Sequence, residues 1–183
     1  MGRELRGSTL GIVGYGAIGR EVARLGAALG MRVLVHDPYV KDAGSLPLAH
    51  VLRESDFVVP LATATEETEN LMDAAAFAEM KRGAYLVNCS RGNLVDEVAL
   101  AAALDSGQLG GAALDVGRAP DQMPTPRLAA RADVIATPHS AGLTPAAIEH
   151  QSLETAAQAA EIVQGRAPKG AVNADHWRRR PKP

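Results

Sequence analysis

Three polar side chains in the second half of the sequence could together carry out chemistry. Arg91 lies in the stretch NCSRG, Asp115 follows the apolar run GGAAL, and His139 lies in TPHSAG. An arginine guanidinium can grasp a carboxylate with two hydrogen bonds and polarise an adjacent carbonyl. A histidine titrates near neutral pH, so it can donate or accept a proton. These residue types predict a carboxylate clamp and an acid–base group, provided that the fold brings them together.

A glycine-rich turn near the N-terminus is the candidate cofactor site. Gly14, Gly16 and Gly19 follow the apolar run TLGIV and lead directly into a helical pattern. In this context the first glycine permits a tight turn, the second lets the backbone approach a pyrophosphate, and the third lets strand and helix pack closely. Ala17 and Ile18 complete the turn, where a helix N-terminus presents free N–H groups to phosphates.

An acidic residue completes this dinucleotide fingerprint. Asp37 ends the next apolar run, eighteen residues after Gly19, where a carboxylate accepts hydrogen bonds from the adenosine ribose. An acid there repels a 2′-phosphate, so NAD is predicted rather than NADP, and neither Arg32 nor Lys41 makes a strong case for NADP. Two alternatives are a glycine turn that binds nothing and a methyltransferase, which also has a glycine loop and an acid after its second strand. A hydride carrier, a carboxylate clamp and an acid–base group are the parts needed to interconvert 2-hydroxy and 2-oxo acids.

The elements that must position these residues alternate between strands and helices. Strands are predicted at 9–14, 31–37, 56–62, 84–90, 109–116 and 133–138, and helices at 17–30, 46–56, 73–83, 94–108 and 144–165. Near-continuous apolar strands that alternate with helices indicate a parallel sheet covered on both faces. We therefore predict an α/β fold with a doubly wound parallel sheet, a three-layer αβα arrangement of the Rossmann NAD-binding type. The carboxyl ends of its strands face the ligand, so the candidate residues should gather at one edge.

Composition and charge narrow the class of protein. The chain has 183 residues, of which 46% are hydrophobic, a formal net charge of −2, and one cysteine. These values predict a globular domain with a real core, give no electrostatic case for nucleic acid, and suit a reducing cytoplasm. No apolar stretch approaches the roughly 20 residues that span a membrane, and we expect no secretory signal. No ligand spacing suggests a metal site.

Four motifs carry a resemblance to a known family. They are GIVGYGAIGREVA, MKRGAYLVNCSRGNLVDEVAL, GGAALDV and ATPHSAG, within a stretch from about 4 to 173. The sequence resembles the cofactor half of the D-isomer-specific 2-hydroxyacid dehydrogenases, a family that includes phosphoglycerate, glycerate, hydroxypyruvate and formate dehydrogenases. The resemblance implies an NAD-dependent oxidoreductase that transfers a hydride between the nicotinamide and C2 of a small D-2-hydroxy or 2-oxo acid.

The same resemblance implies a role for each candidate residue. Arg91 matches the arginine that binds the substrate carboxylate and carbonyl, His139 matches the general acid–base, and Asp115 matches an aspartate near the nicotinamide. The cofactor contacts expected are Gly14, Gly16, Ala17, Ile18, Gly19, Asp37, Cys89, Ser90 and Asp115. The structural alternatives are a solvated arginine, a turn-capping histidine and an aspartate that caps a strand end. Cys89 is interpreted as a small buried residue near a strand end, without a nucleophilic role.

One departure from the family pattern lies in the loop after the GGAALDV motif. Most members have a glutamate five residues after this aspartate, where it hydrogen-bonds the histidine, but Pro120 stands there. A one-residue gap would put Ala119 in that place, and Gln122 is out of register with the glutamine of formate dehydrogenases. We hypothesise that His139 works without a carboxylate, or that Asp121 or Gln122 reaches it by a different loop path.

A second departure concerns domain organisation. In the family a substrate domain is built mostly from the N-terminal part of the chain, whereas here the cofactor pattern begins by Thr9, so we expect that domain to be absent from this sequence. We predict an NAD-binding domain over 1–166 and a return segment with a basic tail over 167–183. The resemblance implies a homodimer through the cofactor domain. The alternative function is a non-catalytic NAD-binding module or sensor, or a subunit completed by another chain.

Overall fold

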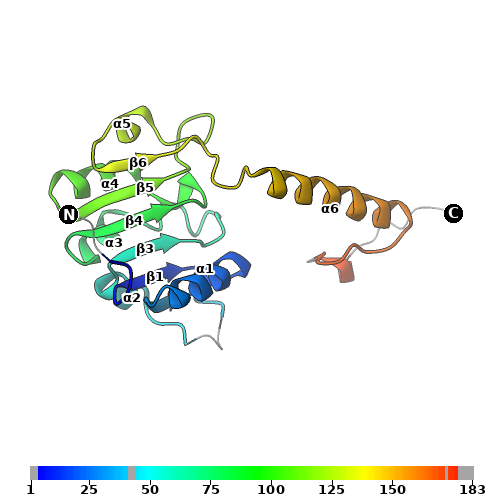
Figure 1. The fold of residues 1–183 in the computed structure, drawn as a ribbon, viewed down its shortest axis with the longest axis horizontal. Helices are drawn as coiled ribbons and strands as arrows, with labels where there is room; N and C mark the ends of the chain where they lie inside the picture. The colour runs from blue at the N-terminus through cyan, green and yellow to red at the C-terminus, as the bar shows by residue number, and fades with distance from the viewer. Residues whose placement is uncertain (1–3, 41–43, 172, 177–183) are drawn as a thin grey trace. The chain divides into compact units, whose positions relative to one another are not determined.

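The computed structural model describes residues 4–40, 44–171 and 173–176, and it divides the chain into two compact units, Met1–Ser140 and Ala141–Pro183. In the first unit six parallel strands form one sheet in the order β2-β1-β3-β4-β5-β6 (Figure 1). The strands are β1 Thr9–Val13, β2 Arg32–His36, β3 Phe57–Pro60, β4 Ala84–Asn88, β5 Leu109–Leu114 and β6 Val134–Ala136. The predicted doubly wound parallel sheet is confirmed.

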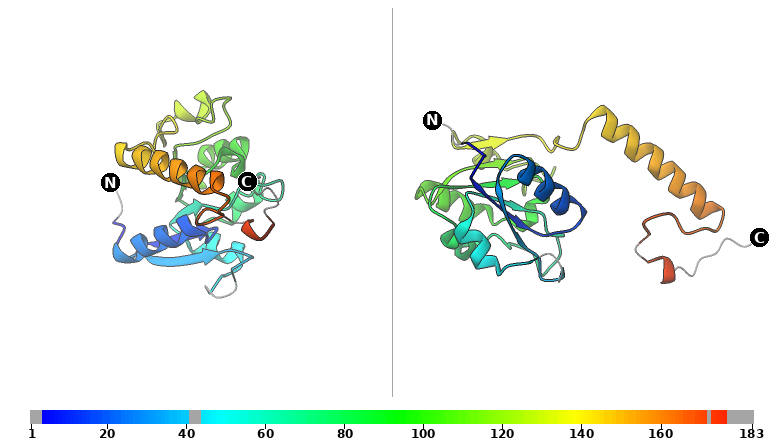
Figure 2. Two further views of the ribbon diagram at one scale, coloured as in Figure 1. Left: turned by 90° about the vertical axis from the view of Figure 1, so that its right-hand side faces the viewer. Right: turned by 60° about the horizontal axis from the view of Figure 1, so that its bottom comes forward.

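Helices lie on both faces of this sheet, as predicted. They are α1 Ala17–Ala28, α2 Leu48–Glu54, α3 Ala74–Glu79, α4 Glu97–Asp105 and α5 Pro126–Ala129, with a 3₁₀ turn η1 at Gly92–Leu94. The chain moves outward from β1 to β2 and then back past β1 to β3. Because each parallel crossover is right-handed, this reversal puts α1 on one face and α2, α3 and α4 on the other (Figure 2).

Alternating strand residues build a core on each face. Leu10 and Ile12 of β1 pack with Ala23 of α1, whereas Val58 and its neighbours pack with Phe77 and the other helices. The helices approach closely, since a Cβ added to Gly11 would lie only 2.3 Å from the Ser55 hydroxyl at the end of α2. This packing fixes the strands, and with them the carboxyl edge where the candidate residues lie.

All five predicted helices are shorter in the structure than in the prediction, and for two of them the local reason is clear. The helix expected from 94 begins only at Glu97, because Gly92–Leu94 forms the 3₁₀ turn and Asp96 caps the helix through its Oδ1, which accepts from Val98 N at 2.9 Å. The helix expected to reach 83 ends at Glu79, since Met80 adopts an extended conformation. The short helix α5, which has a proline in its first turn, lies in a stretch for which no element was predicted.

The second unit consists mainly of one long helix, α6, at Pro145–Val163. Thr144 caps it by accepting from Ala147 N at 3.1 Å, and Gly165 ends it with a φ of +75°. No residue of α6 is buried, and a 3₁₀ turn η2 follows at Ala174–His176. The domain boundary at 166 stays a prediction. Within the residues that the structure describes, no helix has the length and apolar character needed to cross a membrane.

Candidate functional site

The glycine turn lies where β1 ends and α1 begins. Gly14 has a φ of +105°, and a Cβ added there would lie 2.4 Å from the Ala62 backbone nitrogen. A Cβ on Gly19 would lie 2.2 Å from the Gly14 carbonyl oxygen, whereas one on Gly16 would meet nothing within 4 Å. Gly14 and Gly19 are therefore required by the fold itself. Gly16 leaves open the space before the helix N-terminus, which is where a pyrophosphate can approach the backbone.

Asp37 lies directly after β2 and is bonded to this turn. Its Oδ2 accepts from Tyr15 N at 2.7 Å, and its Oδ1 accepts from Tyr39 N at 2.9 Å. Burial alone would raise the pKa of this carboxyl, but the backbone hydrogen bonds outweigh it, so the pKa is lowered. Asp37 is thus an anion beside the glycine turn. Ala17 and Ile18 lie exposed in the first turn of α1.

A cavity of about 360 Å³ opens at the ends of the first three strands. Its lining residues are Val13, Gly14, His36, Asp37, Pro38, Tyr39, Ala62, Thr63, Thr65, Glu67, Thr68 and Leu71. It lies where the strand order reverses around β1, which is the place where open α/β sheets bind ligands. The volume is typical of small-molecule sites. The cavity, the open space at Gly16 and the ionised Asp37 fit a dinucleotide with its adenosine on this side.

A buried asparagine organises the turn after β4. Asn88 is 1% exposed, its Nδ2 donates to Arg91 O at 2.9 Å, and its Oδ1 accepts from Ser90 N at 3.1 Å. Arg91 is exposed, and its Nη1 donates to Ser90 O at 2.8 Å. In the described part of the chain Arg91 has no acidic partner, so most of its donors are available to a substrate carboxylate. Nothing in the sequence pattern around Asn88 marks it for this structural role.

Cys89, in the same turn, differs from its structural interpretation. It is exposed rather than buried, because β4 ends one residue earlier. Protein atoms packed around the sulfur, and then the charge of Asp115, raise the pKa of the thiol, although a hydrogen bond from the Asp115 backbone lowers it. At neutral pH the side chain is therefore a thiol. That it has no nucleophilic role stays a prediction.

Asp115 and His139 are joined through the loop that carries the histidine. Asp115 is 3% exposed, and its Oδ1 accepts from Thr137 Oγ1 at 2.5 Å and from Ser140 N at 2.8 Å. These two partners bracket His139, which has a φ of +52° and donates its backbone N–H to Thr137 O at 3.0 Å. A histidine in this conformation is uncommon and marks a constrained turn. Asp115 thus holds the hydroxyl of Thr137 on one side of His139 and the backbone N–H of Ser140 on the other.

The imidazole of His139 has no carboxylate partner among the described residues. Asp121 uses its Oδ1 to accept from Met123 N at 3.1 Å, within its own turn. Gln122 has a φ of +63° and lines a cavity beside Arg91. Neither of the two replacements considered for the family's glutamate is bonded to the imidazole in this structure.

This second cavity has a volume of about 700 Å³. Its lining residues are Ala64, Thr65, Glu66, Glu69, Arg91, Asn93 and Gln122. Among the described lining residues Arg91 is the one cation, and it lies in the same lining as two acids, Glu66 and Glu69. Thr65 lines both cavities, because the segment Thr65–Leu71 after β3 lies between them.

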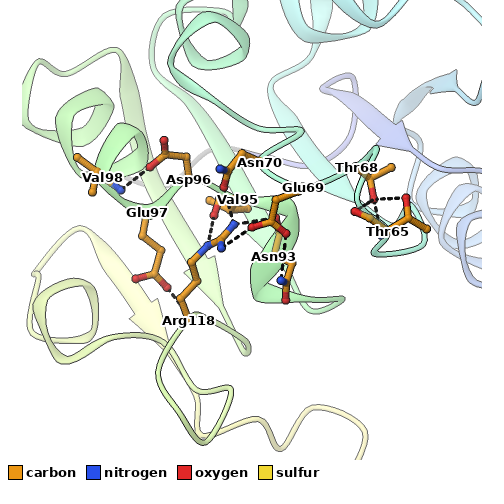
Figure 3. A network of polar contacts seen from close by, with 10 residues as sticks. All are labelled: Thr65, Thr68, Glu69, Asn70, Asn93, Val95, Asp96, Glu97, Val98 and Arg118. Atoms are coloured by element: carbon orange, nitrogen blue, oxygen red, sulfur yellow. Dashed lines mark hydrogen bonds and ion pairs between the residues drawn. The ribbon is translucent and has the colours of Figure 1, made fainter.

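A single arginine ties together the loops around the second cavity. Arg118 Nη1 donates to Glu69 Oε1 at 2.7 Å, Nη2 donates to Asn70 Oδ1 at 2.5 Å and to Asn93 O at 2.9 Å, and Nε donates to Val95 O at 2.9 Å (Figure 3). These partners belong to the loop after β3 and to the turn after β4. The loop after β5 is therefore fastened to two other loops at the same edge of the sheet.

Glu97, at the start of α4, strengthens this connection. Its Oε1 accepts from Arg118 N at 2.9 Å, and its Oε2 accepts from Thr125 Oγ1 at 2.6 Å. Asp96 and Glu97 open the helix, and the carboxylate of Glu97 also holds the loop after β5 at Arg118 and at Thr125. Nothing in the sequence spacing marks Arg118 or Glu97 for this role. Among the described residues, no group of three or more His, Cys, Asp or Glu side chains could hold a metal ion.

Comparisons with known proteins agree with this geometry. The family described as "D-isomer specific 2-hydroxyacid dehydrogenase, NAD binding domain" matches residues 1–141. D-3-phosphoglycerate dehydrogenase from Synechocystis is 37% identical over 180 residues, which cover 94% of this chain and 32% of that protein. (S)-Sulfolactate dehydrogenase from Chromohalobacter salexigens is 43% identical over 152 residues, 79% of this chain and 49% of that protein.

This chain is also similar in fold to a solved structure that was determined with NAD bound. The NAD-complexed D-isomer specific 2-hydroxyacid dehydrogenase from Lactobacillus delbrueckii ssp. bulgaricus superposes with a TM-score of 0.82 at 31% identity, over 94% of this chain and 58% of that one. The chain spans about a third to a half of the length of the two curated relatives. It belongs to the family of NAD-binding domains of the D-isomer-specific 2-hydroxyacid dehydrogenases.

Proposed function

We propose that this chain is the cofactor domain of an NAD-dependent oxidoreductase that interconverts a small D-2-hydroxy acid and its 2-oxo acid. One observation carries the proposal. The glycine turn and Asp37 follow β1 and β2, while Arg91 and the loop of Asp115 and His139 follow β4, β5 and β6, all at the carboxyl edge of one sheet. Relatives act on phosphoglycerate and sulfolactate by name, and the choice of acid for this chain is left open.

The proposed cofactor contacts lie at two parts of the carboxyl edge, one at the ends of β1 and β2 and the other at the ends of β4 and β5. The open space at Gly16, with Gly14, Ala17, Ile18 and Gly19 around it, receives the pyrophosphate, and Asp37 accepts hydrogen bonds from the adenosine ribose. When bound, NAD supplies the nicotinamide ring that accepts or returns the hydride. The remaining contacts, nearer the reacting carbon, are proposed at Cys89, Ser90 and Asp115.

Arg91 and His139 would carry the chemistry on the substrate. Arg91 binds the carboxylate with its free guanidinium donors and polarises the neighbouring carbonyl. In oxidation, the proton of the C2 hydroxyl moves to an imidazole nitrogen of His139 as the hydride leaves C2, and in reduction His139 returns that proton to the carbonyl oxygen. Asp115 supports this role indirectly, because it accepts hydrogen bonds from the Thr137 hydroxyl and the Ser140 backbone N–H, on either side of the histidine.

A non-catalytic NAD-binding module is the second candidate function. It is favoured by the imidazole of His139, which lacks an acidic partner among the described residues, and by the proline at position 120, where most members have a glutamate. Without a carboxylate, the imidazolium loses a stabilising partner, so proton transfer would be slower or shifted in pH. The retained Arg91 favours the enzyme instead.

We also propose a homodimer through the cofactor domain and a cytoplasmic location. The support for the dimer is an apolar groove on the α1 face of the sheet, near Phe57, Tyr85 and Ile135, the last of which is 71% exposed. The support for the location is the single, unpaired Cys89, which suits a reducing compartment. Sedimentation at several concentrations tests the dimer, and a monomer at high concentration would contradict it.

The main proposal is tested by NADH binding and turnover. NADH is titrated by calorimetry, and its oxidation is then assayed with glyoxylate, hydroxypyruvate and pyruvate. We expect binding with turnover, and we expect His139→Asn to abolish turnover while it leaves NADH binding in place. Binding without turnover for all three acids would mean either a cofactor domain that needs a substrate domain for turnover or the non-catalytic module. A folded sample that binds neither NADH nor NADPH would overturn the cofactor assignment.

The partner of His139 can be tested in the same assay. We would record the pH dependence of turnover for Asp121→Asn and Gln122→Ala beside the unaltered chain. A loop path that brings either side chain to the imidazole would shift the apparent pKa in that variant. An apparent pKa that is unchanged in both variants would exclude both partners and leave His139 without one.

A further inference from the structure

We propose that Glu67 is a second acidic determinant, beside Asp37, that selects NAD over NADP. The inference rests on the proposed function, because it assumes that the cavity at the ends of β1, β2 and β3 holds the adenosine. The geometry places both acids in the lining of that one cavity, although thirty residues separate them in the sequence. The sequence fingerprint identifies Asp37 alone, since Glu67 lies in a different loop.

A hydrogen bond across the cavity fixes the position of Glu67. Tyr39, which lies just past Asp37, donates its hydroxyl to Glu67 Oε2 at 3.1 Å. Tyr39 N in turn donates to Asp37 Oδ1 at 2.9 Å. One residue thus connects both carboxylates, and the loop after β2 meets the segment after β3 at the cavity.

Glu67 and Asp37 both affect the same neighbouring group, the hydroxyl of Tyr39. The hydrogen bond to Glu67, its charge, burial and then the charge of Asp37 all raise the pKa of the Tyr39 hydroxyl. Both carboxylates are therefore close enough to the cavity to make it unfavourable for a further anion. A 2′-phosphate carries a charge of about −1.5 to −2 at neutral pH, so two fixed anions exclude it more strongly than one.

Positive charge does not offset these acids among the described lining residues. The described part of the lining contains no arginine or lysine, and His36 uses its Nδ1 in a contact with Leu46 O at 2.8 Å. The guanidinium of Arg20 lies over the Tyr15 ring, 4.7 Å from its centroid, and Arg20 is not among the described lining residues.

The test compares three variants by their ratio of dissociation constants, Kd(NADPH) over Kd(NADH), measured by fluorescence titration. Glu67→Gln removes the proposed charge and keeps the shape of the side chain. Glu66→Gln removes the same charge from the neighbouring residue, which lines the Arg91 cavity instead, and so reports the effect of net charge alone. Tyr39→Phe removes only the hydroxyl that fixes Glu67. Circular dichroism confirms that each variant is folded.

We expect Glu67→Gln to lower this ratio about fivefold, chiefly through tighter NADPH binding, because a unit charge a few ångströms away changes the free energy by that order in water. Glu66→Gln should lower it by much less, and Tyr39→Phe should give an intermediate value. The effect of Glu67→Gln should shrink as salt rises, since salt screens exposed charges.

Two results would overturn the inference while the proposed function stands. One is an unaltered chain that binds NADPH as tightly as NADH. The other is a Glu67→Gln ratio that equals the ratio of Glu66→Gln at low salt. Failure of the proposed function looks different, because then the unaltered chain would bind neither nucleotide.

Discussion

The two ends of the proposed site are built in different ways. At the ends of β1 and β2 the site is held mainly by backbone contacts. Gly14 and Gly19 are required because a Cβ would meet backbone atoms, and Asp37 accepts hydrogen bonds from main-chain N–H groups. At the ends of β4 and β5 side chains hold the loops, through Asn88, the buried Asp115 and the network of Arg118. We call these the backbone-built end and the side-chain-built end.

Because the two ends are built differently, we expect them to respond differently to mutation. A turn that is fixed by glycine conformation fails when a single Cβ is added, because the obstacle is another stretch of backbone that cannot move away. A loop that is held by several hydrogen bonds loses them one or a few at a time, so it loosens before it fails. Loop variation beside Arg91 is therefore compatible with an intact cofactor fold, and the proline at position 120 lies in such a loop.

The largest effect is expected at the backbone-built end. Gly14→Ala forces an alanine to a φ of +105° and brings its Cβ against the Ala62 backbone, so we expect a loss of about 3 kcal/mol or more in the free energy of unfolding. Gly16→Ala is the matched control, since its Cβ would meet nothing within 4 Å. It should leave stability within about 1 kcal/mol and weaken NADH binding. Urea unfolding and NADH titration of both variants measure this contrast.

The opposite result for these two variants would contradict the description of this end as backbone-built. If Gly14→Ala were as stable as the unaltered chain, the turn would not be fixed by its backbone contacts. If Gly16→Ala bound NADH normally, the open space at that position would not be where the pyrophosphate lies.

A smaller loss is expected at the side-chain-built end. Arg118→Met removes the ion pair with Glu69 and the bonds to three other partners, and we expect a loss of about 1–3 kcal/mol. The control is Arg24→Met, whose guanidinium binds only Glu21 on the surface of α1; its effect should stay within about 0.5 kcal/mol. NADH affinity should change by less than about twofold in both variants, because the backbone-built end is untouched. A parallel loss of NADH affinity and stability in Arg118→Met would show that the two ends are coupled.

The same contrast explains what the sequence could predict. The backbone-built end could be predicted almost completely from the glycine spacing, the strand that precedes it and Asp37. A glycine is needed there by the local backbone geometry, so its position in the sequence reveals the turn. Asn88, Arg118 and Glu97 could not be identified in this way. Their roles depend on which loops the fold brings together, and a lone polar residue in a loop has no periodicity to mark it.

Errors in the fold prediction have a related origin. Strand and helix order followed from the alternation of apolar runs, but helix ends depended on local details, such as the 3₁₀ turn at Gly92–Leu94 ahead of Asp96. Cys89 was interpreted as buried because it adjoins an apolar strand, yet the strand ends one residue before it. Local hydrogen bonds decided these points, and the alternation of apolar runs does not reveal such bonds.

A pH-dependent effect is expected for Asp37. Its pKa is lowered, so its hydrogen bonds stabilise the fold at pH values above the ordinary pKa of about 4, and this contribution is lost as the pH falls through the lower pKa of the folded state. Asp37→Asn should therefore flatten the dependence of unfolding free energy on pH below about pH 5. The exposed Glu149→Gln on α6 is the control. An unchanged pH dependence in Asp37→Asn would mean that the backbone N–H groups do not favour the ionised carboxyl.

The smallest effect is expected for the thiol of Cys89, in the turn after β4 at the side-chain-built end. The protein atoms packed around its sulfur, and then the charge of Asp115, raise the pKa of the thiol, so its alkylation by iodoacetamide at pH 8 should be slower than that of a free cysteine. Asp115→Asn removes the second of these causes and keeps the first, so the rate should rise only modestly, on the order of twofold. The hydrogen bonds that Asp115 accepts on either side of His139 would also be altered. Circular dichroism must therefore show that the variant is folded before the rates are compared. A large rise in rate would mean that the loop has opened, and the side-chain-built end would then depend on Asp115 more than on Arg118.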